Sequence, residues 1–281
     1  MNDKRMTNFF RMALAAIPFA AAAAGACAHD SWLSPSRNPA PAGIAAVEIS
    51  TGTRFPVQDF NPAWANVLRP NCNDGRGRVV PFKPFTDQPR WLEMRATAIN
   101  RADPLLSCWA EIKAFEIELP PDIVKIYLDE IHASAAQRAS WADLQARQKP
   151  WHESYRKLMR IELAAAAAAT PEQRALTRKP VGLDLELVIL GTAPVAVGQQ
   201  LEFQLLRDGK PLAGFPLELI SERSKIGIWR TTDEQGTVRH TLPFPGNWLL
   251  HGTDLRLSAQ VPDFWESRFV TLAVEAAAAK P

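Results

Sequence analysis

Alternating apolar and polar positions dominate residues 29–120. Val47 and Ile49 are separated by polar neighbours, Trp91 opens a short apolar run, and the segment 109–119 places Phe115, Ile117 and Leu119 on one face. A period of two residues is typical of strands that bury one face. We therefore expect an N-terminal β domain over residues 29–120.

The period changes to a helical one between residues 121 and 180. Apolar residues recur at helical spacing at Ile123, Ile126, Tyr127 and Ile131, after the start signals Pro121 and Asp122. We expect a second helix from about Trp151, with a stripe of Tyr155, Leu158, Met159 and Leu163, continuing into the alanine run 164–169. Thr170 and Pro171 open another short turn. The sequence thus predicts a helical hairpin inserted at 121–180.

Alternation returns after residue 181. Leu183 to Ile189 and Leu201 to Leu205 each alternate apolar with polar residues, and 207–210 reads as a hairpin turn. Short strands at this spacing favour an antiparallel sandwich over 181–281. The predicted fold class is mainly β, with two β-sandwich parts and an inserted α-helical hairpin.

The first 28 residues have the pattern of an export signal. Basic residues precede an apolar run from Met12 to Ala24, and the run is followed by Ala26-Cys27-Ala28, an A-x-A cleavage site. We expect cleavage after Ala28, a mature chain that begins at His29, and a periplasmic location. An uncleaved anchor and a lipoprotein attached through Cys27 rank below simple cleavage, because the run is short and the lipobox is poor.

Composition excludes one class of partner. The chain has 32 Lys and Arg against 30 Asp and Glu, and removal of residues 1–28 leaves 29 of each. A mature chain near neutrality has no electrostatic basis for binding nucleic acid. After leader removal we do not expect it to be embedded in a membrane.

Two cysteines remain after cleavage, Cys72 and Cys108. An even count in an oxidising compartment indicates one disulfide, and the pair lacks the CxxC spacing of a dithiol metal site.

Short motifs along the mature chain resemble the DUF4198 proteins of bacterial periplasms. They are 29–33 (HDSWL), 51–56 (TGTRFP), 127–128 (YL), 153–157 (ESYRK), 181–187 (VGLDLEL), 206–212 (LRDGKPL), 246–250 (GNWLL) and 265–269 (WESRF). The resemblance implies an immunoglobulin- or transthyretin-like C-terminal sandwich. It also implies nickel or cobalt uptake, the label that some members carry, with an inner- or outer-membrane metal transporter as partner. It supplies no catalytic residue, and only His29 matches the family's His-Asp opening.

His29 is the first candidate metal ligand. A free α-amine and the imidazole Nδ1 of the same residue can chelate one divalent ion, and nitrogen donors suit Ni, Co, Cu or Zn. Asp30 can orient the amine. His240 and His251 flank a predicted turn and form the better second ligand pair if that segment is a hairpin. His132 and His152 are better explained as solvated or paired with carboxylates.

Three functions follow in order. The first is a metal carrier or accessory to metal uptake, and the second is a metal-independent binding or scaffolding module of the cell envelope. A copper-dependent oxidative enzyme ranks last. Because neither a GxSxG nor an HExxH motif is present, we do not expect an enzyme.

Overall fold

A computed structural model describes residues 29–38, 40–41, 43–97, 105–164, 169–224 and 226–278. The predicted leader 1–28 and most of the alanine run lie outside these residues. The strands are β1 (Asp30–Pro35), β2 (Ile44–Gly52), β3 (Val67–Asp74), β4 (Val79–Pro81), β5 (Lys83–Gln88), β6 (Trp91–Thr97), β7 (Leu105–Leu119), β8 (Trp151–Ala164), β9 (Leu185–Leu190), β10 (Gln200–Arg207), β11 (Lys210–Pro211), β12 (Pro216–Ser221), β13 (Ile228–Thr231), β14 (Thr237–Thr241), β15 (Gly246–Leu257) and β16 (Trp265–Ala276). The helices are α1 (Pro121–Glu130), α2 (Ala135–Ala146), α3 (Pro171–Thr177) and the 3-10 turn η1 (Trp64–Asn66).

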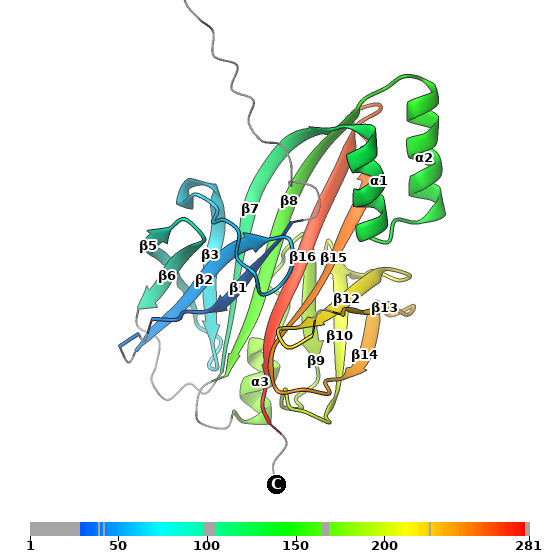
Figure 1. The fold of residues 1–281 in the computed structure, drawn as a ribbon. Helices are drawn as coiled ribbons and strands as arrows, with labels where there is room; N and C mark the ends of the chain where they lie inside the picture. Colours follow the sequence, from blue (N-terminus) through cyan, green and yellow to red (C-terminus); the bar gives the residue numbers. More distant parts are fainter. Residues whose placement is uncertain are drawn as a thin grey trace, which may run out of the picture.

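One large sheet organises the molecule (Figure 1). Its eight strands run in the order β13-β12-β15-β16-β8-β7-β3-β4. A four-stranded sheet, β1-β2-β6-β5, lies against one part of it, and a second small sheet joins β11, β10 and β14, with β9 also paired to β10. Within the large sheet β8 runs antiparallel to β7 and parallel to β16.

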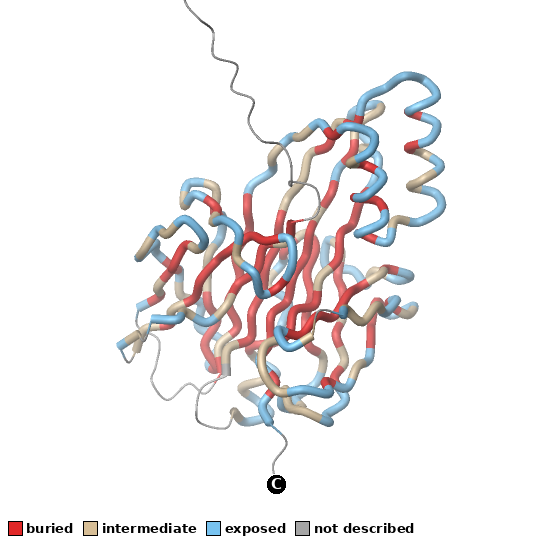
Figure 2. The backbone as a smooth tube through the Cα atoms, viewed as in Figure 1, coloured by how far each residue is buried: buried red, intermediate tan, exposed pale blue. Residues whose placement is uncertain are grey.

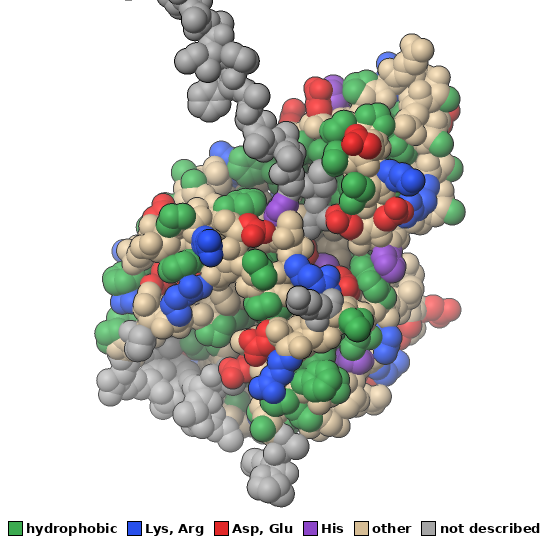
Figure 3. Space-filling model, viewed as in Figure 1, with side chains coloured by type: hydrophobic (Ala, Val, Ile, Leu, Met, Phe, Trp, Pro, Cys, Tyr) green, Lys and Arg blue, Asp and Glu red, His purple; other side chains and the backbone are tan. Residues whose placement is uncertain are grey.

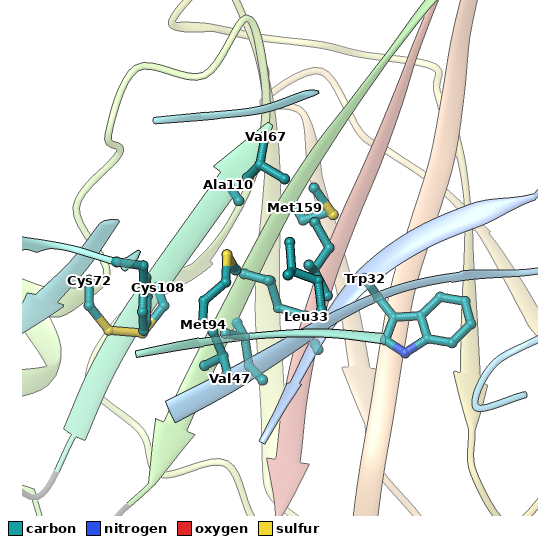
Figure 4. Packing of buried hydrophobic residues seen from close by; sticks show 14 of the residues in the cluster. Trp32, Leu33, Val47, Val67, Cys72, Met94, Cys108, Ala110 and Met159 are labelled. Carbon is teal, nitrogen blue, oxygen red and sulfur yellow. A yellow bond between two sulfur atoms is a disulfide. The ribbon is translucent and has the colours of Figure 1, made fainter. Parts of the chain in front are cut away.

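The large sheet is buried on both faces, because successive residues of a strand point to opposite sides. Met159 and Ile161 enter the core beneath β1, β2 and β6, whereas Leu158 enters the core beneath β9 and β10. Figure 4 shows the first of these cores, in which Trp32, Leu33 and Val47 pack near Met159. In Figure 2 the buried backbone accordingly runs along the central strands. The predicted mainly β fold with sandwich parts is confirmed, and the two parts share this sheet.

The second predicted helix is wrong in position. Residues 151–164 form strand β8, and the second helix of the hairpin is instead α2 at 135–146, opened by a capping box between Ser134 and Gln137. Strand β8 has no alternation of apolar and polar residues because it packs on both faces. Its charged Arg160 and Glu162 are buried in ion pairs, so they do not mark a solvent-facing side. The short element predicted at Pro171 is confirmed as α3.

The helical hairpin α1–α2 packs on the ends of β7, β8, β15 and β16. Tyr127 and Trp141 join Trp151 and Trp265 in a third buried cluster, where the two indoles of 151 and 265 stack with ring centroids 4.7 Å apart. Glu153 lies beneath this cluster and accepts hydrogen bonds from Tyr127 Oη at 3.0 Å and Trp151 Nε1 at 2.9 Å. Burial raises the pKa of Glu153, against the effect of its donors. These contacts hold α1 against β8 and β16.

The predicted disulfide is confirmed. Cys72 and Cys108 lie directly opposite each other on β3 and β7 and are bonded. Among the residues described, no helix has the length and apolar character required to cross a bilayer.

Candidate functional site

A pocket of about 430 Å³ opens where the first residues of β1 meet the end of α1 and strands β12, β13 and β15. Its polar lining comes from five parts of the chain and includes His29, Asp30, Glu130, Glu218 and His251. Isoleucines of α1 and β12 and the indole of Trp229 form the apolar part. Figure 3 shows histidine and acidic side chains on this face, between the small front sheet and the helical hairpin.

His251 joins two of the carboxylates. Its Nδ1 lies 2.8 Å from Asp30 Oδ2 and its Nε2 lies 2.8 Å from Glu218 Oε2. Burial alone would lower the pKa of His251, but the two carboxylates outweigh it and raise the pKa to about 10. The ring is therefore an imidazolium at neutral pH, with both nitrogens donating.

His29 has the opposite character. The residue is only 8% exposed, and its Nδ1 is buried with no hydrogen-bond partner in the part of the chain that the structure describes. Its Nε2 lies 3.9 Å from Asp59 Oδ2. Burial and the nearby ammonium of Lys157 lower the pKa of His29, against the weaker effects of Asp59 and Asp30. The ring is thus neutral near pH 7 and able to offer a lone pair.

The backbone of residue 29 is held by Lys157 of β8. The Lys157 ammonium donates to the carbonyl oxygen of His29, and burial lowers the pKa of Lys157 to about 8. A second cavity, of about 200 Å³, lies beside this contact and is lined by both residues. His29 therefore lines both the first pocket and the cavity beside Lys157. We call the first the acidic pocket, because its lining has four carboxylates (Asp30, Asp129, Glu130 and Glu218) against the two cations Arg54 and His251.

His132 and Trp229 form one wall of the pocket. His132 follows α1 with a φ of 52°, a left-handed conformation that glycine or asparagine adopts more readily. Its ring stacks on the indole of Trp229 at 3.6 Å between centroids. Asp129 and Glu130, at the end of α1, also line the pocket and bring two further carboxylates to it.

The predicted ligand residues separate into two groups. Asp30 and His251 are in contact, and His29 lines the same pocket. His240 lies elsewhere, because its strand β14 pairs with β10 while β15 pairs with β12 and β16. The condition for pairing His240 with His251, a hairpin between them, is therefore not met, since the intervening segment crosses from one sheet to the other.

Sequence reasoning missed Glu218, Lys157 and Trp229 at the site. Glu218 and Lys157 read locally as ordinary polar positions, and Lys157 falls in the segment that was predicted to be a helix. Only the register of β12 with β15, which places Glu218 opposite His251, shows the role of that carboxylate. His152 is paired with Glu118 at 2.7 Å on the surface, as expected of a histidine outside a site.

Among the described residues, no group of three or more His, Cys, Asp or Glu side chains is arranged to hold a metal ion. The orphaned Nδ1 of His29 nevertheless fits one half of an amine–imidazole chelate. Its Nε2 faces a carboxylate, the usual partner of a metal-ligating histidine. The other half would be an α-amine at residue 29, which exists only if the chain is cleaved before His29 as the sequence predicts.

The fold and the pocket together define the class of this protein. It is a mainly β sandwich protein whose candidate site lies at the start of strand β1. The chain belongs to the family described as "Domain of unknown function (DUF4198)", whose profile matches residues 111–253. The match includes Lys157, Glu218 and His251 but not His29 or Asp30. Among curated proteins nothing matches the chain.

Proposed function

We propose that the mature protein binds a divalent transition metal through the α-amine and Nδ1 of His29, as a periplasmic carrier or an accessory to metal uptake. The observation that carries the proposal is the buried Nδ1 of His29, which has no partner among the described residues. A buried polar atom without a partner costs free energy, and an ion bound at the Nδ1 lone pair would offset that cost.

The surroundings of His29 favour this use. The neutral imidazole needs no deprotonation near pH 7, and the Lys157 contact fixes the carbonyl of the residue whose amine would bind. Asp30 is adjacent, but one of its oxygens is already bonded to the imidazolium of His251. Because side chains alone supply fewer than three ligands, affinity should depend on the amine.

The first experiment establishes the mature N-terminus. Intact mass of protein exported with its own leader should correspond to a chain that begins at His29. Calorimetric titration of that protein with Ni²⁺, Cu²⁺, Co²⁺ and Zn²⁺ should then give one site for at least one of these ions. His29→Ala keeps the α-amine but removes the imidazole, so the chelate is lost, and binding should weaken by about a hundredfold.

Two controls separate the chelate from general histidine binding. His152→Ala removes an exposed imidazole far from the pocket and should leave the affinity unchanged. A Gly-Ser-Gly-Ser-Gly-Ser extension before His29 keeps the imidazole but moves the amine away, so it should weaken binding as His29→Ala does. Equal affinity in the wild type and His29→Ala would refute the proposal.

A further inference from the structure

Lys157 is a buried cation that forms no ion pair with a carboxylate of the described residues. The residue is 8% exposed, and its only hydrogen bond in the described part of the chain goes to the carbonyl oxygen of His29. Asp30, the carboxylate with the largest effect on it, is bonded to His251 instead. An ammonium has three donors, so two remain for something else.

Two other buried cations, Arg160 and Arg178, form ion pairs with buried carboxylates. Arg160 bonds the carboxylate of Glu186, and Arg178 forms a two-point contact with Glu162 at 2.7 and 2.8 Å. Each of these guanidinium groups also donates to backbone carbonyls. A buried charge is costly unless it is paired, and no carboxylate of the described residues forms an ion pair with Lys157, so its ammonium is open to a bound anion.

Aromatic rings supply only part of the missing compensation. The Lys157 Nζ lies 5.4 Å from the ring centroid of Phe269 and 5.8 Å from that of Tyr155. Cation–π contacts at this separation contribute less than an ion pair in the same environment.

The cavity beside Lys157 has the right size and lining for a small anion. Its volume is about 200 Å³. Its hydroxyl- and amide-bearing lining residues are Ser31, Thr51, Asn61, Asn66 and Tyr155, and its apolar ones include Phe60, Ile112 and Phe115. The Ser31 and Thr51 hydroxyls lie 2.6 Å apart and share one hydrogen bond, so one of their two hydrogens is left to donate. Hydroxyls and amides donate to carboxylate oxygens, while rings and aliphatic groups accommodate a short hydrocarbon tail.

We propose that this cavity binds a small monocarboxylate, with the carboxylate on the Lys157 ammonium and a short apolar tail among the aromatic side chains. The site shares His29 with the acidic pocket and does not require a bound metal. A carboxylate is preferred to phosphate because one cation and neutral donors face the cavity, and the apolar wall would not hydrate a dianion.

The test uses mature protein treated with a chelator, so that its outcome is independent of the metal proposal. Acetate and propionate are titrated by calorimetry at constant ionic strength, with chloride as the balancing anion. Saturable binding is expected, with propionate tighter than acetate because its extra methylene is buried. Lys157→Met, which keeps the length of the side chain and removes its charge, should weaken binding by about thirtyfold or more.

Lys113→Met is the matched control. Lys113 is an exposed lysine whose Nζ lies 5.6 Å from the ring of Phe115, a residue of the same cavity, so its removal should leave the affinity unchanged. A second measurement uses the wild-type protein and so does not depend on whether the variant folds. In an NMR spectrum of protein labelled with ¹⁵N-lysine, acetate should shift one ammonium resonance, that of a lysine protected from exchange with solvent. Absence of saturable carboxylate binding, or equal affinity in Lys157→Met, would overturn the proposal. Loss of metal binding alone would leave it standing.

Discussion

At the residue scale, two carboxylates are held at opposite nitrogens of one ring. Asp30 on β1 and Glu218 on β12 each lie 2.8 Å from His251. A neutral ring could donate to only one of these carboxylates, and loss of the ring would leave both without this donor. This bridge ties the first strand of the described chain to the large sheet. Because Asp30 directly follows His29 in the chain, the bridge also determines where His29, the candidate metal ligand, lies.

His251→Gln should therefore destabilise the protein in a pH-dependent way. The folded-state pKa of His251, about 10, lies above its ordinary value of 6.5, so the stabilisation is complete below pH 6.5 and is lost as pH rises through 10. Near pH 6 we expect the variant to lose about 3–5 kcal/mol, the usual result of breaking a buried pair. Urea unfolding of both proteins between pH 6 and 10.5 measures the difference, which should shrink with pH. His152→Gln, on the exposed pair with Glu118, should show no such trend, and a difference independent of pH would contradict the assignment.

At the scale of the element, β8 shows why one prediction failed. Its apolar residues fit a helical stripe, and its charged residues look like a solvated face when only the sequence is read. In the sheet, β8 lies between β7 and β16, and its Arg160 is 3% exposed, donating to Glu186 and to the carbonyl of Thr177. Local periodicity does not distinguish a buried ion pair from a surface charge, because both are polar positions.

Arg160→Met tests this buried pair. The substitution leaves the Glu186 carboxylate buried with only backbone N–H donors from residues 181–183, and we expect a loss of about 3–5 kcal/mol. Arg239→Met removes a guanidinium from an exposed pair with Glu202 and should change the free energy of unfolding by about 0.5 kcal/mol or less. Denaturant unfolding of the two variants gives the comparison. Equal effects would show that the pair in β8 is solvated in solution.

At the scale of the whole molecule, two small sheets pack on opposite faces of one large sheet, and a helical hairpin covers its end. The disulfide between Cys72 and Cys108 joins β3 and β7 at one side of the large sheet. Because a crosslink restricts the unfolded chain, its contribution follows from the sequence separation of 36 residues.

Replacing both cysteines, in Cys72→Ser/Cys108→Ser, should lower the free energy of unfolding by about 3–4 kcal/mol, the chain-entropy value for a loop of this length. Guanidinium unfolding of wild-type and variant protein measures the loss. A thiol assay on unfolded wild-type mature protein should detect no free cysteine. Two free thiols in exported protein would contradict the bond.

The sequence by itself determined the elements in which one face is polar and the other apolar, such as β2, β7 and α1, because their periodicity is local. It also indicated the disulfide, because two cysteines remain after residue 28. It placed His29 beside Asp30, because the two are consecutive in the chain. Only the tertiary structure decided that His251 and Glu218 join Asp30, that His240 does not, and that Lys157 is buried beside His29. Those placements depend on which strands pair and in what register, and strand order arises from the packing of distant segments rather than from any local pattern.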